Sequence, residues 1–260
     1  MTHHEGIAPK ELKDKVALVT GAGKRIGRAI AIALAEEGVH VVVHDRRTLE
    51  REATIVNTEV RDCGTRSWQV LADLERPEEC ESLIEQAIKA AGTLDILVNN
   101  ASIFLPGTLN EVGFKDVMRH VQVNAWAPFA LSREFARLAD HGKIVNLLDT
   151  RITGLDRTHA AYVLSKQMLA TLTSMSALEF APRFTVNGVA PGLILPPAGK
   201  DETYLDRLAE TVPLRTHGGP DDIAAAVMYL LKSRFVTGQV IYVDGGSHLR
   251  EELHGPNSYQ

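Results

Sequence analysis

The stretch VALVTGAGKRIGRAIAIALAEEG, residues 16–38, decides the fold of this chain. It starts with the apolar run of a buried strand, passes through a glycine-rich turn and continues as a helix with Ile26, Ile30, Ala33 and Leu34 on one face. Glycines let the backbone turn tightly, and the free N–H groups at a helix start can bind a phosphate. The stretch therefore predicts a dinucleotide-binding turn, although an ordinary strand-to-helix loop can share its composition.

The rest of the chain repeats this alternation of strand and helix. Helical periodicity is clearest over roughly 113–139, 158–182 and 220–232. Successive strand–helix–strand units form a parallel sheet with helices on both faces. We therefore expect an α/β fold, a Rossmann-like doubly wound parallel seven-stranded sheet. The further strand-like runs lie at residues 39–44, 67–73, 94–100, 142–148, 184–190 and 239–245.

No shift in composition divides the chain, so residues 1–260 are expected to form a single NAD(P)-binding domain. Residues 1–13 are polar and charged, and we expect them to be a flexible tail. Residues 193–213 contain several prolines and are long for a strand-to-helix connection. Because long loops of this kind often close over substrates, we expect a substrate loop there.

Charge and composition exclude several classes of function. The net charge is -5 and no run of Lys or Arg stands out, so neither nucleic acid nor a membrane is an expected partner. The two cysteines, Cys63 and Cys80, form no CxxC motif, which indicates a reducing compartment and no zinc site. No signal-peptide pattern is present, and no apolar run reaches the roughly 20 residues of a membrane span. We expect a cytoplasmic protein that acts on a small molecule, with no metal.

Cations beside the glycine turn bear on the choice of nicotinamide cofactor. Lys24 and Arg25 lie within the turn, where positive charge opposes the helix dipole unless a phosphate is bound. At the end of the second strand, Asp45 would favour the free ribose of NAD, whereas Arg46 and Arg47 would accommodate the 2′-phosphate of NADP. Because the cations outnumber the carboxylate, we expect NADPH rather than NADH.

A second group of residues has the spacing of a proton-transfer site. Tyr162 and Lys166 are four apart and share one face of a predicted helix. A tyrosine with an ordinary pKa near ~10 is a poor proton shuttle at neutral pH, and a nearby ammonium stabilises its phenolate. Asp149 follows a buried strand, at the sheet edge where ligands of open α/β sheets bind. It could supply a proton, or it could simply cap the strand end.

Four motifs in order resemble the short-chain dehydrogenase/reductase family: the glycine turn, NNAS at 99–102, YxxxK at 162–166 and VAPG at 189–192. The resemblance covers roughly residues 14–249. It implies a nicotinamide cofactor and a homotetramer or homodimer.

Three departures make the chain similar to the pteridine reductases and dihydromonapterin reductases within that family. The turn carries Arg25 in place of a glycine, NNAS is followed by Phe104, and Asp149 replaces the usual serine. This resemblance implies that Asp149, Tyr162 and Lys166 are catalytic, with Arg25 beside the cofactor phosphates and Phe104 stacking on the pterin. The implied substrate-binding residues are Arg25, Ser102, Phe104, Asp149 and Tyr162.

The family pattern also implies a set of cofactor-binding residues. Asp73 and Leu74 match the adenine contact, although Asp73 could equally cap the following helix. Asn124 matches an asparagine that helps to hold the catalytic lysine through water. The implied set is Gly21, Lys24, Arg25, Ile26, Gly27, His44, Arg46, Arg47, Thr48, Asp73, Leu74, Asn100, Ala101, Ser102, Asn124, Tyr162, Lys166, Pro191 and Gly192.

The function expected from these residues is NADPH-dependent transfer of a hydride to a C=N bond of a pterin or dihydropterin, of the dihydrobiopterin, dihydromonapterin or dihydrofolate type. A carboxylate suits a ring nitrogen that must be protonated and a guanidine-like ring edge. Two alternatives stay open. One is a short-chain dehydrogenase/reductase that acts on a carbonyl or alcohol, and the other is a non-catalytic dinucleotide-binding sensor on the same fold.

Overall fold

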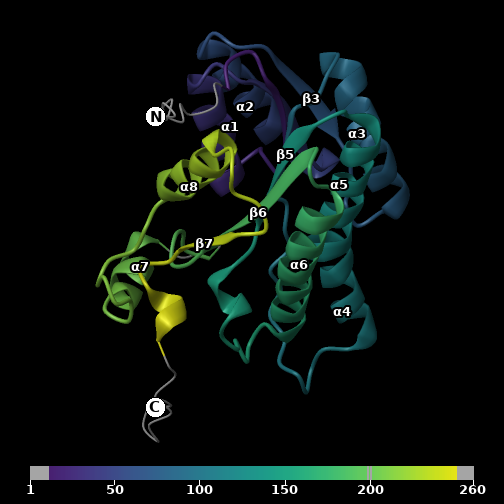
Figure 1. Cartoon of the computed structure of the whole chain (residues 1–260). Helices are drawn as coiled ribbons and strands as arrows, with labels where there is room; N and C mark the ends of the chain where they lie inside the picture. Colours follow the sequence, from purple (N-terminus) through teal and green to yellow (C-terminus); the bar gives the residue numbers. More distant parts are fainter. Residues whose placement is uncertain (1–11, 198, 200, 251–260) are drawn as a thin grey trace, which may run out of the picture.

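The seven predicted strands form one parallel sheet in the computed structural model, which describes residues 12–197, 199 and 201–250. Their order across the sheet is β3-β2-β1-β4-β5-β6-β7. Figure 1 labels β3, β5, β6 and β7, which follow one another across the sheet in that order. This confirms the expected Rossmann-like doubly wound fold. The strands are β1 (Val16–Thr20), β2 (His40–Asp45), β3 (Ser67–Leu71), β4 (Ile96–Asn99), β5 (Gly142–Leu147), β6 (Phe184–Pro191) and β7 (Val240–Val243).

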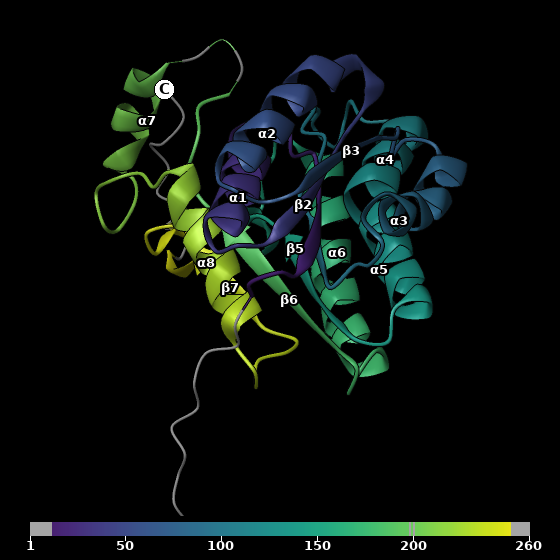
Figure 2. The ribbon, with the colours of Figure 1, turned by 90° about the horizontal axis from the view of Figure 1, so that it is seen from above.

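Helices cover both faces of the sheet, as Figure 2 shows from above. One face packs against α1 (Arg25–Glu36), α2 (Glu50–Asp62) and α8 (Pro220–Lys232). The other packs against α3 (Pro77–Ala91), α5 (Ala127–Leu138) and α6 (Ala160–Glu179), with α4 (Phe114–Val121) beside α6. In the described part of the chain, no helix is long and apolar enough to cross a membrane.

Strand β1 shows why this sequence gives two separate cores. Its side chains alternate between the faces of the sheet, as the period of two in a strand requires. Ala17 and Val19 join the core under α1 and α8, whereas Val16 and Leu18 join the core under α3 and α5. All four are buried, which explains why a strand covered on both faces reads as an uninterrupted apolar run.

The structure departs from the sequence expectations in three places. The helix predicted over 113–139 is divided by a π-helical turn, Gln122–Trp126, between α4 and α5. The predicted substrate loop, 193–213, contains a short helix, α7 (Glu202–Ala209). Of the predicted tail, residues 1–11 lie outside the described residues, and Leu12 is buried in the core beside α1.

The order of the strands fixes where a ligand can bind. Strands β1 and β4 are neighbours in the sheet. The chain leaves them in opposite directions, from β1 to β2 on one side and from β4 to β5 on the other. Ligands of open α/β sheets bind in the crevice outside the carboxyl ends of such strands. Here this crevice lies between the glycine turn after β1 and Asn100 after β4. The side-chain amide of Asn100 donates to the carbonyls of Thr20 and Gly21, at 2.9 and 3.0 Å.

Candidate active site

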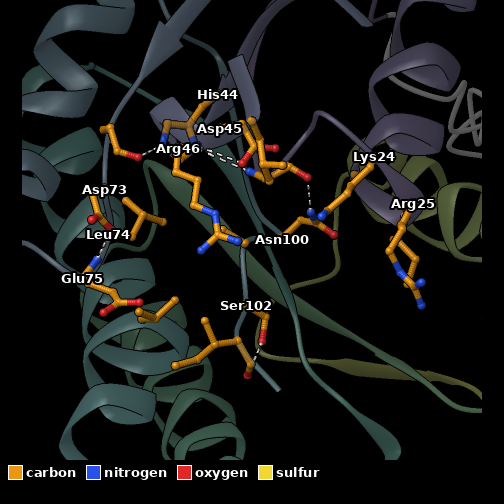
Figure 3. A pocket seen from close by; sticks show the side chains of 18 residues that line it. Lys24, Arg25, His44, Asp45, Arg46, Asp73, Leu74, Glu75, Asn100 and Ser102 are labelled. Carbon is orange, nitrogen blue, oxygen red and sulfur yellow. Dashed lines mark hydrogen bonds between the residues drawn. The ribbon is translucent and has the colours of Figure 1, made fainter. Parts of the chain in front are cut away.

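A cleft of about 300 Å³ occupies this crevice (Figure 3). It brings together the ends of β1, β2, β3 and β4, and most of the predicted cofactor-binding residues line it. Those predicted residues are Gly21, Lys24, Arg25, Ile26, Gly27, His44, Arg46, Asp73, Leu74, Asn100, Ala101 and Ser102. Residues not predicted to bind the cofactor also line it, namely Asp45, Leu49, Ala72, Glu75, Ile103 and Val123.

The glycine turn has the shape and the free donors that a pyrophosphate needs. A side chain at Gly27 would place its Cβ 2.2 Å from the carbonyl oxygen of Gly21, and one at Gly21 would approach the Cα of Ala101 at 2.9 Å. No side chain caps the first turn of α1, and that turn holds no acidic residue. Its backbone N–H groups therefore remain available to an anion, and the turn fits a dinucleotide.

Arg25 replaces a glycine of the family pattern but keeps a glycine-like backbone. Its φ angle is +55°, in the left-handed region that costs an ordinary residue about 1–3 kcal/mol. Its guanidinium donates to the carbonyl of Pro196 at 2.9 Å. Arg25 therefore joins the glycine turn to the predicted substrate loop.

His44 and Asp45 hold the turn in place from the end of β2. The Gly21 N–H donates to His44 Nδ1 at 3.4 Å, so the proton lies on Nε2, which donates to the Ala72 carbonyl at 3.2 Å. Burial lowers the pKa of His44 to about 4, which leaves the ring neutral. Asp45 accepts from the N–H groups of Gly23 and Arg46, at 3.1 and 2.8 Å.

The two arginines after β2 have different surroundings. Arg46 lines the cleft and extends into it in Figure 3. Arg47 instead pairs with Glu79 at 2.6 Å. Arg47 and Thr48 line a neighbouring cavity together with Arg46 and Glu79. The sequence predicted both arginines and Thr48 for cofactor binding, and of the three only Arg46 lies against the cleft.

Asp149 and Tyr162 form a short hydrogen bond, with the Tyr162 hydroxyl donating to Asp149 Oδ2 at 2.7 Å. Burial and the neighbouring Asp149 raise the pKa of Tyr162 well above its ordinary value. Lys166, one turn along α6, donates to the Leu147 carbonyl at 2.7 Å, and burial lowers its pKa to about 8. The predicted catalytic residues are therefore brought together, with the phenol in its protonated form.

Sequence reasoning missed three charged or titratable residues in the segment that follows Asp149. Arg151 Nη1 lies 3.2 Å from Asp149 Oδ2, and its Nε donates to Asp156 at 3.0 Å. The same Asp156 oxygen accepts from His159 at 2.9 Å. The burial of Arg151 lowers its pKa, but the neighbouring carboxylates outweigh that effect and raise the pKa overall. These contacts depend on how residues 149–159 fold back, which no motif in the sequence signals.

Phe104 lies against this group of residues. Its ring stacks on the His159 ring with centroids 3.9 Å apart, and it meets the Tyr162 ring edge-on at 4.7 Å. The Arg151 guanidinium carbon lies 5.2 Å from the Phe104 centroid. Phe104 nevertheless remains 42% exposed, so a flat ring can still reach it.

The other predicted residues surround this site. Asn124, in the π-helical turn, accepts from the N–H of Ile103 and from the Ser102 hydroxyl, at 2.8 and 3.0 Å, and thereby fixes the loop after β4. Pro191 is the last residue of β6 and Gly192 follows it, where a side chain at Gly192 would meet the Cβ of Asp244 at 2.5 Å. Within the described ranges, no group of His, Cys, Asp and Glu could hold a metal ion.

Known proteins resemble the chain over most of its length. A family model described as enoyl-(acyl carrier protein) reductase matches residues 21–248. An uncharacterized oxidoreductase from Mycobacterium tuberculosis is 38% identical, over 90% of this chain and 92% of its own length. The 3-oxoacyl-[acyl-carrier-protein] reductase FabG of Staphylococcus epidermidis is 33% identical, over 91% of this chain and 100% of its own length.

A solved structure has the same architecture. It is the FolM alternative dihydrofolate reductase 1 of Brucella canis, complexed with NADP. The TM-score is 0.86 and the identity 32%, and the match covers 96% of this chain and 100% of that one.

Proposed function

The chain belongs to the short-chain dehydrogenase/reductase family, and on that premise we propose that it is an NADPH-dependent reductase of a dihydropterin C=N bond. The observation that carries the proposal is the 2.7 Å hydrogen bond from Tyr162 to Asp149, a carboxylate at the position of the family's serine. The neighbouring hydroxyl, that of Thr150, donates to Asp244 at 2.7 Å and so does not replace the serine.

Tyr162 is the proton donor in this proposal. A reduction consumes a proton, so the acid must start in its protonated form. Asp149 can only accept a hydrogen bond when ionised, and it accepts one from the phenol, in agreement with the raised pKa of Tyr162. Arg151 stabilises the ionised carboxylate at 3.2 Å, which favours Tyr162 over Asp149 as the acid. Tyr162 would therefore protonate the ring nitrogen of the substrate.

Lys166 would stabilise the phenolate that remains. Its Nζ lies 5.8 Å from the centre of the Tyr162 ring. A pKa lowered to about 8 keeps it largely protonated at neutral pH and able to exchange a proton. Phe104 would place the flat substrate ring, because aromatic rings stack in offset or edge-on arrangements.

The cleft supports NADPH as the cofactor. The glycine turn would hold the pyrophosphate, and Lys24 and Arg46 would face the additional phosphate. When bound, NADPH supplies the hydride. Asp45 does not oppose this choice, since both of its oxygens accept backbone N–H groups and its side chain is buried. The FolM relative, whose structure contains NADP, is in line with the proposal.

The alternative function is reduction of a carbonyl group, and the similarity to FabG favours it. The two functions differ in what Asp149 must do. A carbonyl oxygen needs a hydroxyl donor, whereas a ring nitrogen beside a guanidine-like edge is compatible with a carboxylate.

The test follows NADPH oxidation with dihydrobiopterin, dihydromonapterin and dihydrofolate, beside a panel of ketones. We expect turnover of at least one dihydropterin, and a loss of about 10²–10⁴-fold in Tyr162→Phe, which removes the proton donor, the usual contribution of acid–base catalysis. Ketone turnover alone, retained in Asp149→Ser, would establish the carbonyl alternative. NADPH binding without turnover of any substrate would indicate a sensor.

A further inference from the structure

We propose that Arg151, Asp156 and His159 are positioning residues, which hold the proton-donating pair and the aromatic ring in one rigid unit. The proposal rests on the assignment of Tyr162 as the acid, but not on the identity of the substrate ring. Hydrogen bonds of 3.3 Å or less link Arg151 to Asp149, Asp156 to Arg151, and His159 to Asp156. None of the three belongs to the predicted catalytic group of Asp149, Tyr162 and Lys166.

Arg151 fixes the orientation of the Asp149 carboxylate. Its Nη1 lies 3.3 and 3.2 Å from the two carboxylate oxygens, and its backbone N–H donates to Asp149 Oδ1 at 2.8 Å. With those positions taken, Oδ2 accepts the Tyr162 hydroxyl at 2.7 Å. An Arg–carboxylate pair restricts direction as well as distance, because the guanidinium is planar.

Asp156 joins this ion pair to the aromatic ring. Its Oδ2 accepts from Arg151 Nε at 3.0 Å and from His159 Nδ1 at 2.9 Å. Its Oδ1 accepts from the N–H and hydroxyl of Thr158, at 2.8 and 2.6 Å, so the carboxylate is itself held in place. The His159 ring then supports Phe104 by stacking at 3.9 Å.

The arrangement predicts separate effects for the two ends of the unit. Arg151 acts through Asp149 on proton transfer, so its loss should reduce kcat and move the acid limb of the pH profile. His159 acts through Phe104 on ring placement, so its loss should raise KM. Asp156 bonds to both, so its loss should change both parameters.

The charged and titratable groups around Asp149 define what the pH profile reports. Arg151 contacts it from its own segment, Asp156 pairs with Arg151, and His159 pairs with Asp156. Tyr162 and Lys166 face it from α6. Behind it, Thr150 bonds to Asp244, which also accepts from His248 at 2.9 Å. Of these groups, Arg151 is the cation in direct contact with the Asp149 carboxylate, so its removal should move the acid limb.

The experiment compares kcat, KM and pH profiles of the full-length wild type with those of Arg151→Met, Arg151→Lys, His159→Ala and Asp156→Ala. For Arg151→Met we expect kcat to fall roughly 10- to 100-fold, the effect of one charge-assisted hydrogen bond, and the acid limb to move to higher pH because the carboxylate loses its contacting cation. Arg151→Lys should return the limb toward the wild type. His159→Ala should raise KM several-fold with the limb unchanged.

Arg28→Met is the matched control, because Arg28 makes a bidentate pair with Glu59, at 2.8 and 2.6 Å, outside the cleft. Arg28→Met should change neither kcat nor KM. If Arg151→Met does not fold, as judged by NADPH binding, the pH profile of Arg151→Lys carries the test. An unmoved limb in both Arg151 variants, or equal changes of kcat and KM in Arg151→Met and His159→Ala, would overturn the proposal. Absence of turnover with every substrate would overturn it together with the proposed function.

Discussion

Two aspartates of the site show that hydrogen-bond partners decide what a carboxylate does. Asp149 receives a phenol and a guanidinium, so it can orient a proton donor. Asp45 stands where an acidic residue usually holds the ribose of NAD, yet its oxygens receive the N–H groups of Gly23 and Arg46. Burial raises the pKa of Asp45, and these hydrogen bonds act in the opposite direction. Asp45 therefore braces the glycine turn.

Arg46 and Arg47 allow a matched test of cofactor choice. Arg46→Ala should weaken NADPH binding by roughly 10- to 100-fold and NADH binding far less, because it removes a charge-assisted contact to the additional phosphate. Arg47→Ala should change both affinities little, since the Arg47 side chain is 62% exposed and paired with Glu79. Binding of both nucleotides can be followed by nicotinamide fluorescence. Equal losses of NADPH and NADH in Arg46→Ala would contradict the assignment.

At the scale of elements, the end of β2 acts as a brace between β1 and β3. The His44 ring links the turn after β1, through Gly21, to Ala72 after β3. Sequence reasoning placed His44, at the end of the second strand, in the cofactor-binding set that the family pattern implies. The structure places it against the cleft but also shows both ring nitrogens bonded to backbone groups, so its ring also holds the three strand ends together.

Because the buried His44 ring must stay neutral, the free energy of unfolding should fall in acid. The pKa of His44 is about 4 in the folded state and near 6.5 when unfolded, so the unfolded chain binds more protons between these values. The contribution of neutral His44 to the free energy of unfolding is therefore fully present above about pH 6.5. It declines by on the order of 3 kcal/mol as the pH falls toward 4. Urea unfolding at pH 7, 5 and 4 should show a smaller loss for His44→Gln than for the wild type. Parallel losses in the two proteins would refute this account.

The fold of the whole molecule was largely predictable, because strand and helix periodicities are local properties of the sequence. The group formed by Asp149, Tyr162 and Lys166 followed from spacing and family resemblance. The contacts of Arg151 and His159 were not predictable, since they arise only when residues 149–159 fold back beside Phe104. The same holds for the different surroundings of Arg46 and Arg47, which depend on Glu79 in α3.

The outer surface of α4, α5 and α6 bears on how whole molecules associate. These helices lie side by side on one face of the sheet (Figure 1). Monomeric proteins seldom expose large apolar patches, and the family resemblance implies a homotetramer or homodimer. We therefore expect a second copy of the chain to cover this surface. Its exposed apolar side chains include Met118, Leu164, Met168, Met175 and Leu178, with Trp126 in the π-helical turn between α4 and α5.

Light scattering after size-exclusion chromatography tests this expectation. The wild type should have a mass of two or four times 28.4 kDa. The double variant Leu164→Glu and Met168→Glu should have a smaller mass, because it places two carboxylates on neighbouring turns of α6, where Leu164 and Met168 are 47% and 37% exposed. Ile55→Glu is the matched control, since Ile55 is 48% exposed on α2, which packs against the other face of the sheet. A monomeric wild type, or a double variant with the wild-type mass, would show that this surface does not join copies of the chain.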